Sequence, residues 1–176
     1  HRLTCSGLDI PGGMKNPTPG DVEVTLNSIQ ASQAPHVFSY NRWEVKTPGN
    51  PLTHAVLRGA VDYHGLAVPN YHYEDLVQFA ESYQKRGLVN PTMIVDTNHA
   101  NSNKKYAEQP RIAMEVMRSR QHSPVLKQMI RGFMIESFIE EGAQKVDGGV
   151  YGKSITDPCL GWKDSEQLIR DLAALV

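Results

Sequence analysis

The chain of 176 residues has little cysteine, no strong excess of charge and no long hydrophobic run. Its only cysteines, Cys5 and Cys159, are too few for a disulfide framework or a thiolate zinc site, and we expect both to be ordinary thiols. No apolar run approaches the roughly 18 residues of a membrane span, and no signal-peptide pattern opens the chain. We therefore expect a cytoplasmic protein without a membrane partner.

The charges are nearly balanced, with 18 Lys and Arg against 19 Asp and Glu, a formal net charge of -1. Because no basic stripe is present, we expect no nucleic-acid partner. Hydrophobic residues make up 40% of the chain, which is enough to build a core. The length suits one domain, residues 1–176, and is too short for a complete eight-stranded α/β barrel of about 250 residues.

Short apolar runs alternate with helical patterns, which is typical of βα units and a parallel sheet. The clearest helix is predicted from Tyr73 to Arg86, with Gly87 ending it, and a buried strand is predicted from Thr92 to Asp96. Turn formers dominate residues 41–51, and Asp164 with Gln167 makes a capping-box pattern for a last helix. Further strands are predicted at 10–15, 36–40, 54–58 and 133–135, and further helices near 22–29, 112–117 and 125–130.

Polar residues follow several of these strands, where the loops of parallel α/β proteins build their sites. His99, Glu136 and Asp157 offer one imidazole nitrogen and two carboxylates, a set suited to a divalent metal such as manganese, iron, cobalt or zinc. Lys15 and Arg58 offer cations that can hold a phosphate or a carboxylate. Since the spacing is no motif by itself, solvated or salt-bridged roles stay open as alternatives.

The remaining histidines and the pair Lys104-Lys105 show no such pattern. The lysines are predicted to belong to a solvated face, and the histidines to be structural or exposed. These histidines are His36, His54, His64, His72 and His122.

Several separate segments, in fixed order, resemble the C-terminal portion of class I 3-deoxy-D-arabino-heptulosonate 7-phosphate (DAHP) synthases. The resemblance extends over nearly all 176 residues, which makes it more specific than any single segment. The matching segments are Ser6-Gly7-Leu8, Met14-Lys15-Asn16, Ala34-Pro35-His36, Leu57-Arg58-Gly59, Asp96 to Ser102, Met134 to Ser137 and Tyr151 to Trp162.

The resemblance implies an α/β fold, the C-terminal half (strands five to eight) of a (β/α)8 TIM barrel with a β-hairpin insertion. It implies that His99, Glu136 and Asp157 hold the metal, manganese first, with iron, cobalt or zinc as alternatives. Lys15 and Arg58 match cations that bind phosphoenolpyruvate. The family reaction is the aldol-type condensation of phosphoenolpyruvate with erythrose 4-phosphate to DAHP and phosphate, the first step of the shikimate pathway.

The sequence also departs from the family pattern. The family's GPCS-type segment with its cysteine ligand, and its KPR and GART-type segments, do not occur here, and Cys5 and Cys159 lie in other contexts. We therefore expect the isolated chain to be inactive or nearly so, and to need the N-terminal half of the barrel or self-association. A short segment 41–50, and Asp9 in place of a more common serine, put feedback control by an aromatic amino acid in doubt.

Two alternatives remain open at this point. In the first, the chain is a non-catalytic truncated half-barrel module that binds metal or assembles with a partner. In the second, it belongs to a related phosphoenolpyruvate-dependent aldol synthase that makes a different sugar acid.

Overall fold

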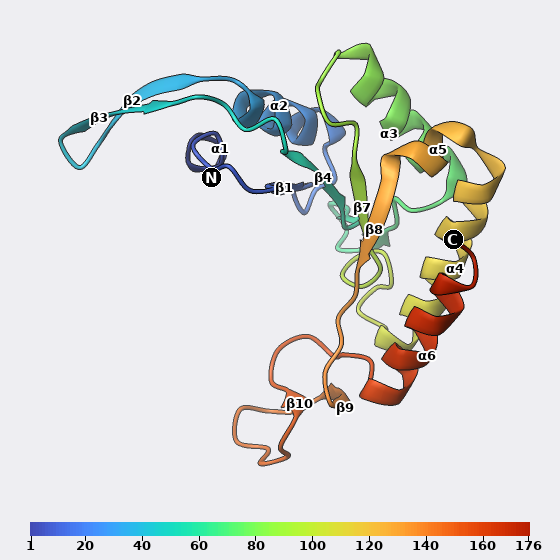
Figure 1. Cartoon of the computed structure of the whole chain (residues 1–176). Coiled ribbons are helices and arrows are strands. Elements are labelled where there is room, and N and C mark those ends of the chain that lie inside the picture. The colour runs from blue at the N-terminus through green and yellow to red at the C-terminus, as the bar shows by residue number, and fades with distance from the viewer.

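A sheet of four parallel strands, in the order β1-β4-β7-β8, forms the centre of the computed structural model, which describes all of residues 1–176 (Figure 1). The strands are β1 Gly13–Lys15, β4 His54–Leu57, β7 Met93–Asp96 and β8 Ile130–Met134. Neighbouring strands pair in parallel along the whole order. The carboxyl ends of all four strands therefore meet at one edge, as the sequence predicts for an α/β fold.

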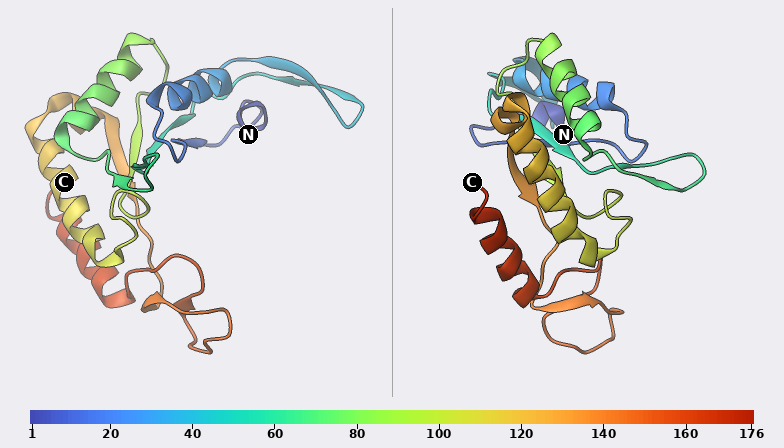
Figure 2. Two further views of the ribbon diagram at one scale, coloured as in Figure 1. Left: turned by 180° about the vertical axis from the view of Figure 1, so that it is seen from behind. Right: turned by 90° about the vertical axis from the view of Figure 1, so that its right-hand side faces the viewer.

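Helices pack on one side of this sheet and leave the other side uncovered (Figures 1 and 2). They enclose one core cluster of 16 buried residues, to which α2, α3, α4 and α5 contribute together with the strands. The helices are α1 Arg2–Cys5, α2 Val22–Gln33, α3 Tyr73–Lys85, α4 Gln109–His122, α5 Pro124–Met129 and α6 Trp162–Ala173. α6 lies beside α4, where Leu168 and Ala113 share a smaller buried cluster.

Alternation along the strands decides which side chains face the core. Met93 and Val95 of β7 are buried in the core cluster, and Met14 of β1 packs against it. Because successive side chains of a strand point to opposite faces, Lys15 and Asp96 point to the uncovered face.

The remaining strands form small two-stranded elements, the pairs β5 Ala60–Val61 with β6 Ala67–Val68 and β9 Glu140–Ala143 with β10 Lys153–Ser154. The third pair is an antiparallel hairpin of β2 His36–Tyr40 and β3 Trp43–Thr47, which extends away from the body of the molecule (Figure 1). At its tip Asn41 and Arg42 have φ angles of 48° and 70°, as a two-residue hairpin turn requires. A hairpin thus lies between Lys15 and Arg58, where the family resemblance places one.

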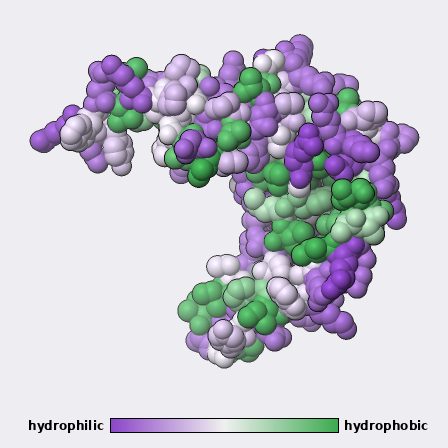
Figure 3. All heavy atoms as spheres, in the orientation of Figure 1, coloured by the Kyte–Doolittle hydropathy of each residue, from purple (hydrophilic) through white to green (hydrophobic).

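The molecule is curved and open on the left in Figure 1, with the β2–β3 hairpin at one end of the curve and the β9–β10 segment at the other. Hydrophobic atoms gather in the hollow between them (Figure 3). Met134, Phe138 and Ile139 at and beyond the end of β8 are all exposed. β1 and β8 each have one edge without a neighbouring strand of the sheet. No helix combines the length and the apolar character needed to cross a membrane.

Four local predictions differ from the structure. The strand predicted at 10–15 is limited to residues 13–15, because Pro11 has no backbone N–H to donate to a neighbouring strand. The capping box is wrong, because α6 begins two residues before Asp164, with Gly161 as N-cap, and the Trp162 N–H is held by the Ile139 carbonyl. Residues 43–47, within the segment of turn formers, form strand β3. β8 begins at Ile130 rather than Phe133, since Ile130 and Gly132 pair with Met93 and Ile94 of β7, and the register shifts between these two pairs.

Candidate metal and anion site

The carboxyl edge of the sheet brings His99, Glu136 and Asp157 together, although they lie far apart in the sequence. His99 Nε2 lies 3.6 Å from Asp157 Oδ2 and 3.9 Å from Glu136 Oε1. One potential ligand atom from each of the three residues lies within 4.8 Å of the others. The three side chains predicted from the strand ends therefore share one location.

This donor set fits a divalent metal ion. Ligand atoms at about 2.0–2.2 Å from one ion lie about 3–4 Å apart, which agrees with the separations from His99 Nε2. One imidazole nitrogen and two carboxylates suit manganese, iron, cobalt or zinc. The side chains are only partly exposed, His99 the least, at 15%.

A lysine that the sequence analysis assigned to a solvated face contacts this cluster. Lys104 Nζ donates a 2.8 Å hydrogen bond to Asp157 Oδ1, although the lysine side chain is 60% exposed. This hydrogen bond, with the charges of Lys104, His99 and Arg58, lowers the pKa of Asp157 from its ordinary value. Asp157 is therefore a carboxylate at neutral pH, which is the form that binds metal.

Asp96, at the end of β7, connects the histidine to the lysine. Its Oδ2 atom lies 2.7 Å from Lys15 Nζ and 2.8 Å from His99 Nδ1, while Oδ1 accepts a 2.9 Å hydrogen bond from the Asn98 N–H. The two Oδ2 contacts have ion-pair distances but not the angles of hydrogen bonds. Asp96 is predicted from the sequence to end a strand, and the sequence pattern indicates no further role for it.

Three buried side-chain polar atoms of the chain make no hydrogen bond, and all three belong to this edge of the sheet. They are Arg58 Nε, Asp96 Oδ2 and His99 Nδ1. An unsatisfied buried polar group costs about 1–3 kcal/mol, so such atoms are rare in folded proteins and call for an explanation. Asp96 Oδ2 and His99 Nδ1 face each other at 2.8 Å, so Arg58 Nε is the atom of the three that a polar ligand would satisfy.

Asparagine side chains hold the loop that carries Arg58. Asn16 Oδ1 accepts a 2.8 Å hydrogen bond from the Arg58 N–H, and its Nδ2 donates to the Gly59 carbonyl at 2.9 Å. Asn70 Oδ1 accepts from the Gly59 N–H at 2.8 Å, and the Asn70 N–H donates to Asn101 Oδ1 at 2.9 Å. These bonds tie the ends of β1, β4 and β7 together and fix the backbone on which Lys15 and Arg58 stand.

Gln109, the first residue of α4, holds the backbone of Glu136 from both sides. Its Oε1 accepts from the Glu136 N–H and from the Thr97 hydroxyl, and its Nε2 donates to the Glu136 carbonyl, all at 2.9 Å. Gln109 is 0% exposed. Sequence reasoning missed this residue, because nothing in the local pattern separates it from a solvent-facing glutamine.

Neither cysteine lies in the candidate metal cluster. Cys5 and Cys159 are both free and buried. Burial chiefly raises the pKa of Cys159, and the negative charges of Glu136 and Asp157 raise it further, so this thiol stays protonated. Both residues are the ordinary buried thiols that the sequence predicts.

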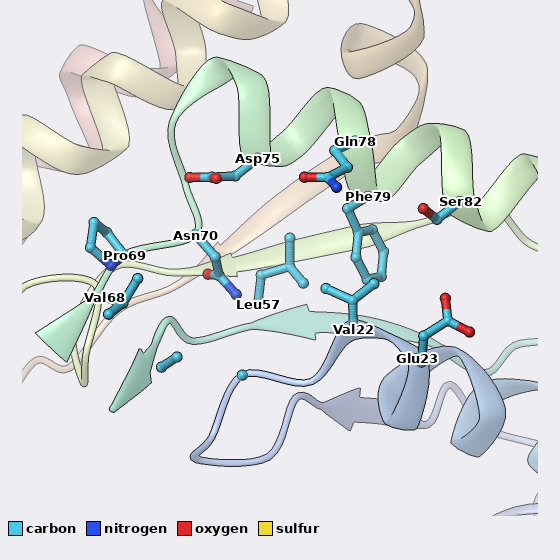
Figure 4. A pocket seen from close by; sticks show the side chains of 12 residues that line it. Val22, Glu23, Leu57, Val68, Pro69, Asn70, Asp75, Gln78, Phe79 and Ser82 are labelled. Carbon is cyan, nitrogen blue, oxygen red and sulfur yellow. The ribbon is translucent and has the colours of Figure 1, made fainter. Parts of the chain in front are cut away.

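A separate cavity of about 380 Å³ lies between α2 and α3 (Figure 4). Leu57 and Phe79 line its apolar part, and Asn70, Asp75 and Gln78 contribute polar groups. None of the five candidate residues lines it. The candidate site at the sheet edge is thus separate from this cavity among the helices.

Residues 1–170 match the model of the DAHP synthetase I family. The chain is 40% identical over 184 aligned residues to the Trp-sensitive phospho-2-dehydro-3-deoxyheptonate aldolase of Enterobacter agglomerans, and 39% identical to the Phe-sensitive one of Escherichia coli (strain K12). All of this chain is covered in both comparisons, and 50% of each relative.

The fold of this chain is also similar to a solved structure. The phospho-2-dehydro-3-deoxyheptonate aldolase of Francisella tularensis SCHU S4 superposes with a TM-score of 0.89 at 29% sequence identity, covering 100% of this chain and 51% of that one. The chain therefore spans about half the length of the relatives that it matches. Family model, sequence relatives and structure agree, and the chain belongs to the DAHP synthetase I family.

Proposed function

We propose that this chain supplies the metal-binding and part of the anion-binding side of a DAHP synthase. The reaction is the condensation of phosphoenolpyruvate with erythrose 4-phosphate to DAHP and phosphate, the first step of the shikimate pathway. The observation that carries the proposal is the convergence of His99, Glu136 and Asp157 at the edge that also carries Lys15 and Arg58. Membership of the family supports the reaction class.

In this reaction C3 of phosphoenolpyruvate attacks the aldehyde carbon of erythrose 4-phosphate, and the aldehyde oxygen takes up a proton. Water adds to C2, and the bond from C2 to the bridging oxygen breaks to release phosphate. A divalent cation, manganese first, supplies Lewis-acid stabilisation of the negative charge on the aldehyde oxygen when it is bound. His99, Glu136 and Asp157 would hold this cation.

Lys15 and Arg58 hold the carboxylate and phosphate groups of phosphoenolpyruvate in position. Arg58 Nε is buried without a hydrogen-bond partner, so an anionic oxygen placed there gains a charge-assisted bond. Because the asparagine bonds to the Arg58 and Gly59 backbone fix this loop, little ordering remains to be done when the substrate binds.

The four parallel strands represent strands five to eight of a TIM barrel. The free edges of β1 and β8, and the exposed hydrophobic residues in the hollow, support a complementary half that closes the barrel. We expect this complementary half to be the N-terminal half of a synthase, and the alternative partner is a second copy of this chain. The chain alone is inactive or nearly so, because its own site lacks the family's cysteine ligand and its KPR and GART-type segments.

A complementation assay tests this proposal. Phosphate release from phosphoenolpyruvate and erythrose 4-phosphate is measured with Mn²⁺ for the chain alone and for the chain co-expressed with the N-terminal half of the Enterobacter agglomerans relative. We expect product only from the combination, and none when His99→Ala is introduced. Full turnover by the chain alone would contradict its dependence on a second half. A well-folded, metal-loaded combination that forms no DAHP would contradict the function and favour a non-catalytic module.

The sugar phosphate is tested in the same assay. Erythrose 4-phosphate is replaced by other aldose phosphates, and the products are identified by mass spectrometry. A clear preference for a different aldose phosphate would favour a related phosphoenolpyruvate-dependent aldol synthase.

A further inference from the structure

Asp96 is the only charged residue among the 42 buried residues of the chain. Its side chain is 0% exposed, and a carboxylate without water costs several kcal/mol unless charges and hydrogen bonds compensate it. The compensation comes from three sources: the Asn98 N–H at Oδ1, and Lys15 Nζ and His99 Nδ1 at Oδ2. A residue placed at such cost, in contact with two candidate site residues, needs a function.

The contact with Asp96 decides which nitrogen of His99 carries the proton. A carboxylate oxygen accepts hydrogen bonds, so the ring nitrogen at 2.8 Å from Oδ2 carries its proton when the ring is neutral. Nε2 then keeps a free lone pair, and this atom is the one that lies 3.6–3.9 Å from Asp157 and Glu136. The tautomer that Asp96 selects is therefore the one that can bind a metal.

The backbone around His99 is arranged for this contact. His99 has a φ of +43°, a left-handed conformation that costs a residue with a side chain about 1–2 kcal/mol. The turn after β7 is held by Asn101 Nδ2, which donates to the Asp96 carbonyl at 2.7 Å, and by Ser102 Oγ, which donates to Asn98 Oδ1 at 2.7 Å. These bonds offset the strained φ and fold the imidazole back over the carboxylate of Asp96.

We propose that Asp96 is a positioning residue, whose Oδ2 fixes the Nδ1–H tautomer of His99 and so aims Nε2 at the metal position, while Lys15 neutralises the buried carboxylate. The proposal rests on the proposed function, because it gives His99 its role as a ligand. The contact between Oδ2 and Nδ1 lacks the angles of a hydrogen bond in the present structure. At this distance a lone pair on Nδ1 would face the lone pairs of the carboxylate, so the proton on Nδ1 is favoured in the metal-free chain as well.

The test measures directly which ring nitrogen of His99 carries the proton. The chain is labelled with ¹⁵N-histidine, and two-bond ¹H–¹⁵N spectra are recorded without metal at about pH 8, where most histidines are neutral. His99→Gln assigns the signal. We expect the Nδ1–H pattern in the wild-type chain and its loss in Asp96→Asn, whose side chain no longer provides a charged acceptor. Asp147→Asn, which removes an exposed carboxylate, is the matched control and should leave the signal unchanged.

A second measurement tests the consequence for metal binding. Mn²⁺ affinity is measured by electron paramagnetic resonance for the wild-type chain, Asp96→Asn and Asp147→Asn. We expect Asp96→Asn to weaken Mn²⁺ binding about 10–100-fold. An Nε2–H pattern for wild-type His99 would overturn the proposal, even if Asp96→Asn failed to fold. An unchanged tautomer in a folded Asp96→Asn chain would overturn it as well. If His99 carries the proton on Nδ1 but neither the chain nor its combination with the N-terminal half binds Mn²⁺, the proposed function fails while Asp96 keeps its role in fixing the ring.

Discussion

Replacing Gln109 with alanine tests how the helix layer positions a metal ligand. The variant removes three buried hydrogen bonds, but two of the groups involved keep another partner. The Thr97 hydroxyl also donates to the Met134 carbonyl at 3.1 Å, and the Glu136 carbonyl also accepts from the Leu160 N–H at 2.9 Å. Only the Glu136 N–H is left unpaired, at a cost of about 1–3 kcal/mol.

Adding the smaller net loss of the other two bonds gives a destabilisation of about 2–4 kcal/mol. Urea unfolding of the chain measures this value. Gln121→Ala is the matched control, because Gln121 lies on the exposed side of the same helix and makes no side-chain hydrogen bond. We expect the control to stay within about 0.5 kcal/mol of the wild-type chain.

Gln109→Ala should also weaken Mn²⁺ binding about 10–100-fold, since Glu136 loses the hydrogen bonds that fix its backbone. Gln109→Met, which keeps the side-chain volume, separates the loss of hydrogen bonds from the loss of packing. If Gln109→Ala proved as stable as Gln121→Ala, Gln109 would not hold the end of β8 and the reasoning would be refuted.

Three further predictions follow from the perturbed pKa values. Lys104→Met should raise the pKa of Asp157 toward its ordinary value, so that Mn²⁺ binding is lost at a higher pH than in the wild-type chain. Lys105→Met is the control. Equal pH profiles of Mn²⁺ binding for the two variants would contradict the role of Lys104. Burial raises the pKa of Tyr83 from 10.0 to about 12, so the stability that its protonated form provides is complete below pH 10 and is lost as the pH rises toward about 12. Ultraviolet titration should find one tyrosine that ionises this late, and ionisation of every tyrosine near pH 10 would refute it. The raised pKa of Cys159 predicts slow reaction of the folded chain with a thiol reagent and fast reaction in urea; rapid labelling of the native chain would be the contrary result.

Elements with a strong period were predictable from the sequence. The helix at 73–86 and the strand at 92–96 agree closely with α3 and β7, because each has a clear apolar pattern and ends at a turn-forming segment. Strand β3 was missed although Trp43 and Val45 alternate with polar residues, since turn formers flank it at Asn41 and at residues 48–51. The start of α6 was misjudged because a carbonyl from another segment fixes the first helical N–H.

The candidate site could be predicted in part. The rule that loops at strand ends build the site was enough to select the residues that converge, because it depends only on strand order. It could not find Gln109, nor the ion pair between Lys104 and Asp157, since both contacts join segments separated by dozens of residues. The role of Asp96 was also hidden, because it depends on the left-handed turn that brings His99 back over the strand end.

A crystal of this chain soaked in Mn²⁺ and measured at the manganese absorption edge tests the central claim most directly. We predict an anomalous peak within about 2.0–2.3 Å of His99 Nε2 and of a carboxylate oxygen from both Glu136 and Asp157. A manganese ion bound elsewhere, with these three side chains left free of metal, would contradict it.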